Sequence, residues 1–215
     1  MPEDIPRGNN LNIHANPEST IDPFVLARMR QHQEGILSIA GQYIGQRNVD
    51  IGCGTGIPSL IQQEKLGISS VLCDVVDIRE EAAKSLEFHK IEHNHPLPFE
   101  DKSFDSSFIE YVLHHVPTRD AAINLLSEAF RIASRVLLVE EIRGEKTDVA
   151  LAKSVDEQLN ALMHSSIPMP VREYFSEDEV RALVRGLGHE IIVHHVIDRG
   201  LKENGFLEKH LFVAE

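Results

Sequence analysis

Three glycines on alternate positions separate an apolar segment from an amphipathic one, in the stretch VDIGCGTG at residues 49–56. They are Gly52, Gly54 and Gly56, and the acid Asp50 precedes the first of them by two positions. Glycine allows the backbone to turn sharply and a ligand to approach without a Cβ in the way. Between a strand and a helix, such a loop is typical of a small-molecule site at the carboxyl edge of an α/β sheet. The alternative is a plain tight turn, so the rest of the chain must decide.

The spacing of the glycines separates two classes of nucleotide cofactor. The dinucleotide fingerprint is G-x-G-x-x-G, with the pyrophosphate bound at the helix N-terminus. Here the third glycine of that pattern would fall at Ile57, a branched residue. This argues against a nicotinamide or flavin cofactor and therefore against a nicotinamide oxidoreductase. The acid before the first glycine instead suits a ligand that carries a positive charge, because opposite charges attract at short range.

The stretch 49–56 resembles the first motif of the class I S-adenosylmethionine (SAM) methyltransferases. The resemblance implies SAM as the cofactor and a glycine loop that lies against it. The residues of this motif that we expect to bind the cofactor are Asp50, Gly52, Cys53, Gly54 and Gly56.

A further acid is expected about 20 residues beyond the glycines, where one carboxylate can bind both ribose hydroxyls. Asp74 lies 18 residues after Gly56, and Asp77 lies 21 residues after it. Asp74 directly follows an apolar segment at 71–73, which we interpret as a strand. We therefore prefer Asp74 for the ribose and keep Asp77 as the second candidate.

The segment LPFEDKSFD at 97–105 resembles the sequence before the fourth strand of small-molecule methyltransferases. In that family the residue just before this motif contacts the adenine amino group and is usually an acid. This chain has His93 and Asn94 there, which departs from the pattern, although the Asn94 amide oxygen can accept a hydrogen bond. The following strand ends near Glu110, which the resemblance places beside the methionine part of SAM, where it could offset the sulfonium charge.

Three residues at or just beyond the ends of the fourth and fifth predicted strands are candidates for catalysis: Tyr111, His115 and Glu141, with Glu140 as the alternative to Glu141. The carboxyl ends of neighbouring parallel strands face one crevice, so these side chains are expected near the acceptor. A base is needed only if the acceptor loses a proton at or before transfer. Asp156 and Asn160, one helical turn apart in a later segment, resemble substrate-side polar positions of the family only loosely.

Two histidine pairs raise the question of a metal. We interpret His114 and His115 as neighbours on one helix, where adjacent side chains do not point together. His194 and His195 fall in a predicted strand, where neighbours point to opposite faces. We therefore expect no metal in the site, and His93 and His95, which share one loop, stay open as a weak site.

The rest of the pattern alternates strands and helices, which predicts a parallel sheet with right-handed crossovers. A closing hairpin at 189–196 and 206–214 would add an antiparallel strand at the far end. The predicted strands are 47–51, 71–73, 86–91, 104–111 and 135–141, and the predicted helices are 22–33, 35–45, 57–66, 119–132, 147–163 and one that begins at 176.

The resemblance covers about residues 34–215 and implies a Rossmann-like three-layer α/β sandwich. Its sheet has seven strands, mostly parallel, with one antiparallel strand. Residues 1–33 are expected to form an N-terminal arm and helix, and a helical insertion at about 145–172 is expected over the active site.

Composition narrows the class of acceptor. The formal net charge is −13, and we find no cluster of Lys and Arg, so nucleic acid and anionic membranes are poor partners. No apolar run approaches the ~20 residues of a membrane span, and the two cysteines fit free thiols in a reducing, cytoplasmic setting. The sequence predicts methyl transfer to a small molecule. A non-catalytic SAM-binding module that serves a partner or a regulatory role is the alternative.

Overall fold

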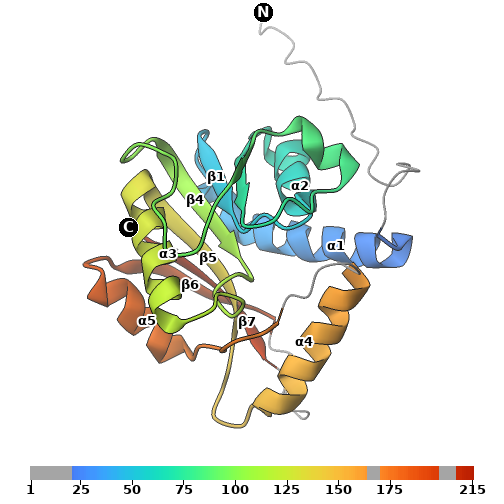
Figure 1. Cartoon of the computed structure of the whole chain (residues 1–215), viewed down its shortest axis with the longest axis vertical. Helices are drawn as coiled ribbons and strands as arrows, with labels where there is room; N and C mark the ends of the chain where they lie inside the picture. Colours follow the sequence, from blue (N-terminus) through green and yellow to red (C-terminus); the bar gives the residue numbers. More distant parts are fainter. Residues whose placement is uncertain (1–20, 164–169, 199–206) are drawn as a thin grey trace, which may run out of the picture.

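A sheet forms the centre of the molecule, with helices on both faces (Figure 1). The computed structural model describes residues 21–163, 170–198 and 207–215. Within these residues the sheet has seven strands, six running in parallel and one reversed, as the resemblance implied. From one edge to the other the strands are β3 (Phe88–Lys90), β2 (Val71–Asp74), β1 (Asn48–Ile51), β4 (Phe104–Glu110), β5 (Ala133–Ile142), β7 (Glu208–Ala214) and β6 (Ile191–Asp198).

The reversed strand is not at the far end of the sheet, so that prediction is wrong. β7 lies between β5 and β6 and pairs antiparallel with both of them. The hairpin signal identified the β6 and β7 partnership, but it carries no information on which of the two strands meets β5. The burial of β7 answers that question, because Leu211, Phe212 and Val213 are at most 1% exposed and need cover on both faces.

Two hydrophobic cores lie on opposite faces of the sheet. One face is covered by α1 (Pro23–Ala40), α2 (Ile57–Leu66) and the 3-10 turn η3 (Glu81–Ser85), whose buried side chains pack together with Phe108 of β4. The other face is covered by α3 (Arg119–Ile132) and α5 (Glu177–Gly186), which pack around Ile109 of the same strand. Consecutive residues of β4 thus point into different cores, as the two-residue period of a strand requires.

One helix stands where two were predicted at residues 22–33 and 35–45. α1 begins behind Asp22, whose carboxylate accepts hydrogen bonds from the Phe24 and Val25 amides, and it runs to Ala40 before the 3-10 turn η2 (Gly41–Tyr43). Gly35 does not end the helix, because a glycine within a helix costs only about 1 kcal/mol relative to alanine. Buried side chains before and after it hold the helix on the core: Leu26, Ile36, Leu37 and Ala40.

The predicted insertion contains α4 (Val149–Met163), which stands apart from the two helical layers in Figure 1. Ala152 of this helix packs in a small cluster with Val171, Tyr174 and Leu207. The remaining residues of the predicted loop at 165–170, apart from Pro170, lie outside the described residues, as do the predicted arm at 1–20 and the glycines at 200 and 205.

No helix among residues 21–163, 170–198 and 207–215 combines the length and the apolar character needed to cross a membrane.

Candidate active site

The glycine loop joins β1 to α2 at the carboxyl edge of the sheet. Gly52, Gly54 and Gly56 all have positive φ angles, of 78°, 52° and 71°. The Gly52 and Cys53 amides donate hydrogen bonds of 2.8 and 3.1 Å to the carbonyl of Cys73 in β2, which fixes the loop against the sheet. Each glycine therefore adopts a backbone conformation that other residues adopt only at a cost, as the sequence pattern predicted.

Gly52 and Gly54 differ in what surrounds them, and the difference is testable. A Cβ on Gly52 would lie 2.4 Å from Val112 Cγ2, whereas a Cβ on Gly54 would have no atom within 4 Å. We expect Gly54→Ala to cost roughly 1–2 kcal/mol from the positive φ alone. Gly52→Ala should cost about 1–3 kcal/mol more, because Val112 must also move to make room for the added methyl group. Urea unfolding of both variants measures this, and equal losses of stability would contradict it.

Asp74 and Asp77, the two candidates for the ribose, lie in different surroundings. The Asp74 carboxylate accepts hydrogen bonds from the Gly54 amide at 2.9 Å and the Val75 amide at 2.6 Å, so it lies against the glycine loop. The Asp77 carboxylate instead forms a two-point ion pair with Arg79, with both distances at 2.9 Å. This geometry favours Asp74 over Asp77, in line with the preference from the sequence.

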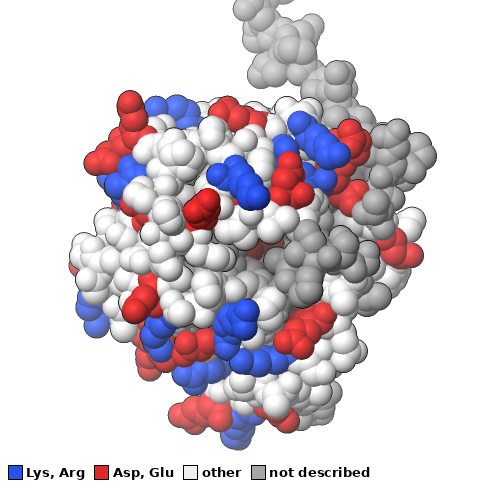
Figure 2. All heavy atoms as spheres, viewed as in Figure 1, with Lys and Arg blue, Asp and Glu red and all other residues white. Residues whose placement is uncertain are grey.

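A cavity of about 380 Å³ opens beside this loop. That volume falls in the range of small-molecule sites, which are mostly apolar with a few polar groups. On the face drawn in Figure 2, acidic and basic side chains are interspersed around a hollow near the centre. The lining includes Gly52, Asp74, Val75, Ile91, His93, Asn94, Tyr111, Val112, His115, Leu125 and Arg172.

Not all predicted cofactor residues line this cavity. Gly52, Asp74 and Asn94 do, and Asn94 also accepts a hydrogen bond of 3.1 Å from Asn124, another residue of the lining. Cys53 is buried, and it is a free thiol, as is Cys73. The other predicted residues are not among those that line the cavity: Asp50, Gly54, Gly56, Asp77 and Glu110.

Two carboxyl groups are buried behind the glycine loop. Asp50 accepts a hydrogen bond from the Ser59 hydroxyl, and burial is the main cause that raises the pKa of Asp50 to about 7. Burial, with a smaller contribution from Asp50, raises the pKa of Glu110 to about 8. The Oε2 atom of Glu110 is buried and has no hydrogen-bond partner among the described residues. A cationic ligand nearby would favour the ionised form of both groups.

The raised pKa of Asp50 predicts how stability changes with pH. From about pH 4 to 7 the unfolded chain ionises Asp50 while the folded chain keeps it protonated, so the unfolding free energy of the wild type falls as pH rises. Asp50→Asn removes this dependence. Its stability relative to the wild type should rise by a few kcal/mol between about pH 4.5 and 7.5.

Denaturant unfolding at a series of pH values, without ligand, measures the effect. Asp77→Asn is the matched control. Arg79 lowers the pKa of Asp77, so the contribution of Asp77 to the unfolding free energy increases as pH rises, opposite to that of Asp50. A stability difference between Asp50→Asn and wild type that does not change with pH would contradict the assignment.

Tyr111 directly follows β4 and has a φ of 56°, which turns the chain sharply at the sheet edge. Its hydroxyl forms a hydrogen bond of 2.6 Å with His32 Nε2 of α1, and Lys209 Nζ of β7 lies 5.2 Å from the centre of its ring. Burial raises the pKa of Tyr111 well above its usual value and lowers the pKa of His32 to about 4, so both groups are neutral at pH 7. Tyr111 thus lines the cavity with its hydroxyl held by His32.

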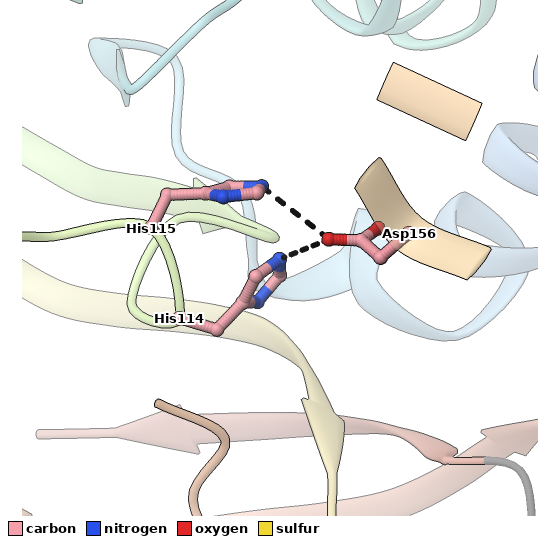
Figure 3. A group of neighbouring side chains, drawn as sticks. All are labelled: His114, His115 and Asp156. Carbon is pink, nitrogen blue, oxygen red and sulfur yellow. Dashed lines mark ion pairs between the residues drawn. The ribbon is translucent and has the colours of Figure 1, made fainter. Parts of the chain in front are cut away.

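His114, His115 and Asp156 come together, contrary to the expectation from the sequence (Figure 3). His114 Nε2 lies 3.7 Å and His115 Nε2 3.9 Å from Asp156 Oδ2. The prediction that the two rings diverge is wrong, because residues 112–118 form turns and not a helix. His194 instead contacts His210 of β7, with a nitrogen-to-nitrogen distance of 2.9 Å.

Glu140 and Glu141 at the end of β5 have different roles. Glu140 is fully buried, and its carboxylate lies 2.5 Å from His114 Nδ1 and accepts a hydrogen bond from the Leu113 amide. Burial opposes the charged form of His114, but the Glu140 carboxylate outweighs it and raises the pKa of His114 to about 9. Burial raises the pKa of Glu141, whose Oε2 atom has no hydrogen-bond partner among the described residues.

Some residues at the site were missed from the sequence. His32 and Lys209 reach Tyr111 from elements far apart in the chain, and Tyr174 brings its ring to 5.4 Å from the His114 ring. No local motif marks these positions. The strand order gave one general expectation. A strand that pairs with β5 places one of its side chains near the end of β5 where the site lies.

Comparisons with known proteins agree with this geometry. Residues 49–137 match a family model described as a methyltransferase domain. The match agrees with the resemblance of the glycine loop to the class I SAM-dependent methyltransferases. The match spans β1 to β5, and therefore the glycine loop, Asp74 and the turn after β4. Among curated proteins, no sequence matches this methyltransferase.

Solved structures share the fold of this methyltransferase at low sequence identity. A SAM-dependent methyltransferase from Methanosarcina mazei is 21% identical, with a TM-score of 0.61 over 82% of this chain and 95% of that chain. The 1,6-didemethyltoxoflavin-N1-methyltransferase of Burkholderia thailandensis, with bound acceptor and S-adenosylhomocysteine, is 17% identical, with a TM-score of 0.61 over 87% and 77%. Magnesium protoporphyrin IX methyltransferase from Synechocystis is 18% identical, with a TM-score of 0.59 over 87% and 83%.

The residues present fit SAM as the cofactor of this methyltransferase. A Cβ on Gly54 would have no atom within 4 Å, so the loop leaves space for a ligand there. The Gly54 amide donates a hydrogen bond to Asp74, which is one of the residues that line the cavity. Apolar side chains such as Val75 and Ile91 line the wall beside it and suit a flat ring. The Glu110 carboxyl group is buried near the loop with a raised pKa, and a cationic ligand would favour its ionised form.

Proposed function

We propose that this methyltransferase acts on a small molecule that binds at the carboxyl ends of β4 and β5. The observation that supports this is a cavity whose lining includes Gly52 and Asp74 together with Tyr111 and His115. Its volume of about 380 Å³ suits small ligands. Two of the similar structures are methyltransferases named for small molecules, 1,6-didemethyltoxoflavin and magnesium protoporphyrin IX. Their names also favour this class of acceptor.

In this proposal Asp74 binds the ribose hydroxyls and the glycine loop lies against the rest of the nucleoside. Asn94 accepts from the adenine amino group, and Glu110 offsets the positive charge of the ligand. When bound, SAM supplies a methyl group on a positively charged sulfur. The chain then has to align the acceptor and exclude water, and alignment alone can contribute roughly 7–11 kcal/mol.

Glu141 is the residue that we propose as general base for acceptors that lose a proton, although it lies at the end of β5 and not among the residues that line the cavity. Burial raises its pKa, which strengthens it as a base, and its Oε2 atom makes no hydrogen bond to the described residues. Lys209 Nζ lies 3.9 Å from its other oxygen and holds the side chain at the edge of the sheet. Tyr111 stays protonated because burial raises its pKa, so it donates a hydrogen bond and does not take a proton.

A fractionated cell extract tests the class of acceptor. The enzyme is incubated with SAM labelled in the methyl group and with either the low-molecular-mass fraction or the protein and nucleic-acid fraction. We expect label in the small-molecule fraction, with S-adenosylhomocysteine formed in equal amount. Label only in the macromolecular fraction would overturn the proposal, and so would SAM binding without transfer to either fraction.

A further inference from the structure

The strongest further candidate is the cluster of His114, His115 and Asp156 at the edge of the cavity. We propose that these three side chains bind a first-row divalent transition metal such as Zn²⁺, with a coordination position open to the cavity. Binding of the ion does not depend on methyl transfer, so the proposal stands apart from the assigned activity.

The distances are close to those of a metal site. Zinc binds imidazole nitrogen at about 2.0–2.1 Å and carboxylate oxygen at about 2.0–2.2 Å, so tetrahedral ligands lie about 3.4 Å apart. Asp156 Oδ2 lies 3.7 Å from His114 Nε2 and 3.9 Å from His115 Nε2. The three donor atoms all lie within 4.8 Å of one another. The two distances to Asp156 are thus within about 0.5 Å of the spacing that a tetrahedral ion requires.

Both rings have their other nitrogen beside an acceptor. Glu140 Oε1 lies 2.5 Å from His114 Nδ1, and the Pro170 carbonyl lies 3.4 Å from His115 Nδ1. An acceptor at Nδ1 holds one proton there, so a metal that binds at Nε2 of His114 displaces the second proton, which the raised pKa keeps on the ring at pH 7. A carboxylate behind a ligating histidine is the usual arrangement around zinc. These contacts orient both Nε2 atoms toward Asp156, as Figure 3 shows.

One residue beside the cluster has a buried polar atom without a partner. The hydroxyl of Tyr174 is buried with no hydrogen-bond partner among the described residues, although the residue is only 1% exposed. Its ring lies 5.4 Å from that of His114, and His115 lines the cavity. A buried polar atom without a partner commonly marks a missing water or ion. An ion held by three protein ligands would keep a position for a water or an acceptor atom.

A second cluster provides an internal comparison. Glu177, His194 and His210 also lie within reach of one ion. There the two rings are already joined by a hydrogen bond of 2.9 Å, and the cationic Arg181 lies 3.0 Å from His194 Nδ1. A guanidinium at that distance repels a metal ion, so we expect this cluster to stay metal-free.

Cobalt titration of the full chain tests the proposal. Protein freed of metal with a chelator is titrated with Co²⁺, and d–d absorption and calorimetry report binding. We expect one Co²⁺ per chain, displaced by Zn²⁺ and not by millimolar Mg²⁺, which prefers oxygen ligands. His115→Gln and Asp156→Asn should each abolish the signal, and Glu140→Gln should weaken binding roughly 10- to 100-fold.

His194→Gln is the matched control and should bind Co²⁺ like the wild type. Circular dichroism and thermal unfolding check that each variant is folded. No saturable binding at millimolar Co²⁺ would overturn the proposal, in which case a proton alone bridges His114 and Asp156. Loss of binding in His194→Gln, with binding retained in His115→Gln, would also overturn it, because the ion would then lie in the other cluster.

Discussion

Asp74→Asn should weaken SAM binding by about 10- to 100-fold, the largest loss of affinity that we expect from a single change. The carboxylate lies at the cavity edge beside the glycine loop, where it can accept from both ribose hydroxyls. Hydrogen bonds to a charged group are worth about 1.5–3 kcal/mol, and 1.4 kcal/mol corresponds to a factor of ten in affinity. Calorimetric titration with SAM measures the loss.

The neighbouring acid provides the control for this prediction. Asp77 forms its ion pair with Arg79 on the exposed side of the loop, so Asp77→Asn should change the SAM dissociation constant less than about fivefold. Thermal unfolding without ligand shows whether the loss of the Gly54 and Val75 hydrogen bonds to Asp74 destabilises the loop itself. A larger effect of Asp77→Asn than of Asp74→Asn would assign the ribose to the other carboxylate.

Glu141→Gln should lower kcat by about 10²- to 10⁴-fold for an acceptor that loses a proton, and should leave SAM affinity unchanged. The amide keeps the size of the side chain but cannot take a proton. Because burial raises the pKa of Glu141, the rate of the wild type should rise with pH through that raised pKa and then level off. The variant should lack this rise.

Glu145→Gln is the matched control, since Glu145 is exposed in the loop that follows β5. It should retain the rate and the pH profile of the wild type. An unchanged kcat in Glu141→Gln, measured with the acceptor identified by the fractionation experiment, would remove Glu141 from the reaction. In that case the acceptor either carries no proton to lose or is served by another group.

Local signals predicted the elements that local interactions determine. α3 spans Arg119–Ile132, as its apolar stripe indicated, and Thr118 caps it through a hydrogen bond to the Ala121 amide. α5 begins at the predicted capping box, in which Ser176 and Glu179 each bond to the backbone of the other. The glycine pattern predicted a sharp turn, and the structure has positive φ angles at all three glycines.

Non-local interactions determine what the sequence did not indicate. The order β5, β7, β6 depends on which strand is buried on both faces, and that depends on the rest of the sheet. The meeting of His114 with Asp156 depends on the turn after β4 and on where α4 lies. Asp50 was expected to meet a cation, but it lies behind the loop, hydrogen-bonded to Ser59. The position of Asp50 two residues before the first glycine indicated that it lies near the loop, but it did not indicate where the side chain points.

The position of β7 between β5 and β6 has a consequence for biosynthesis. β7 is the last strand of the sheet to leave the ribosome. It pairs with β5, which is made well before it and already has β4 on its other side. Until β7 arrives, the β5 edge carries unpaired backbone groups next to an apolar surface, a template for association with other chains. Nascent chains halted after β6 should therefore need chaperones, although the strands around the glycine loop are already complete.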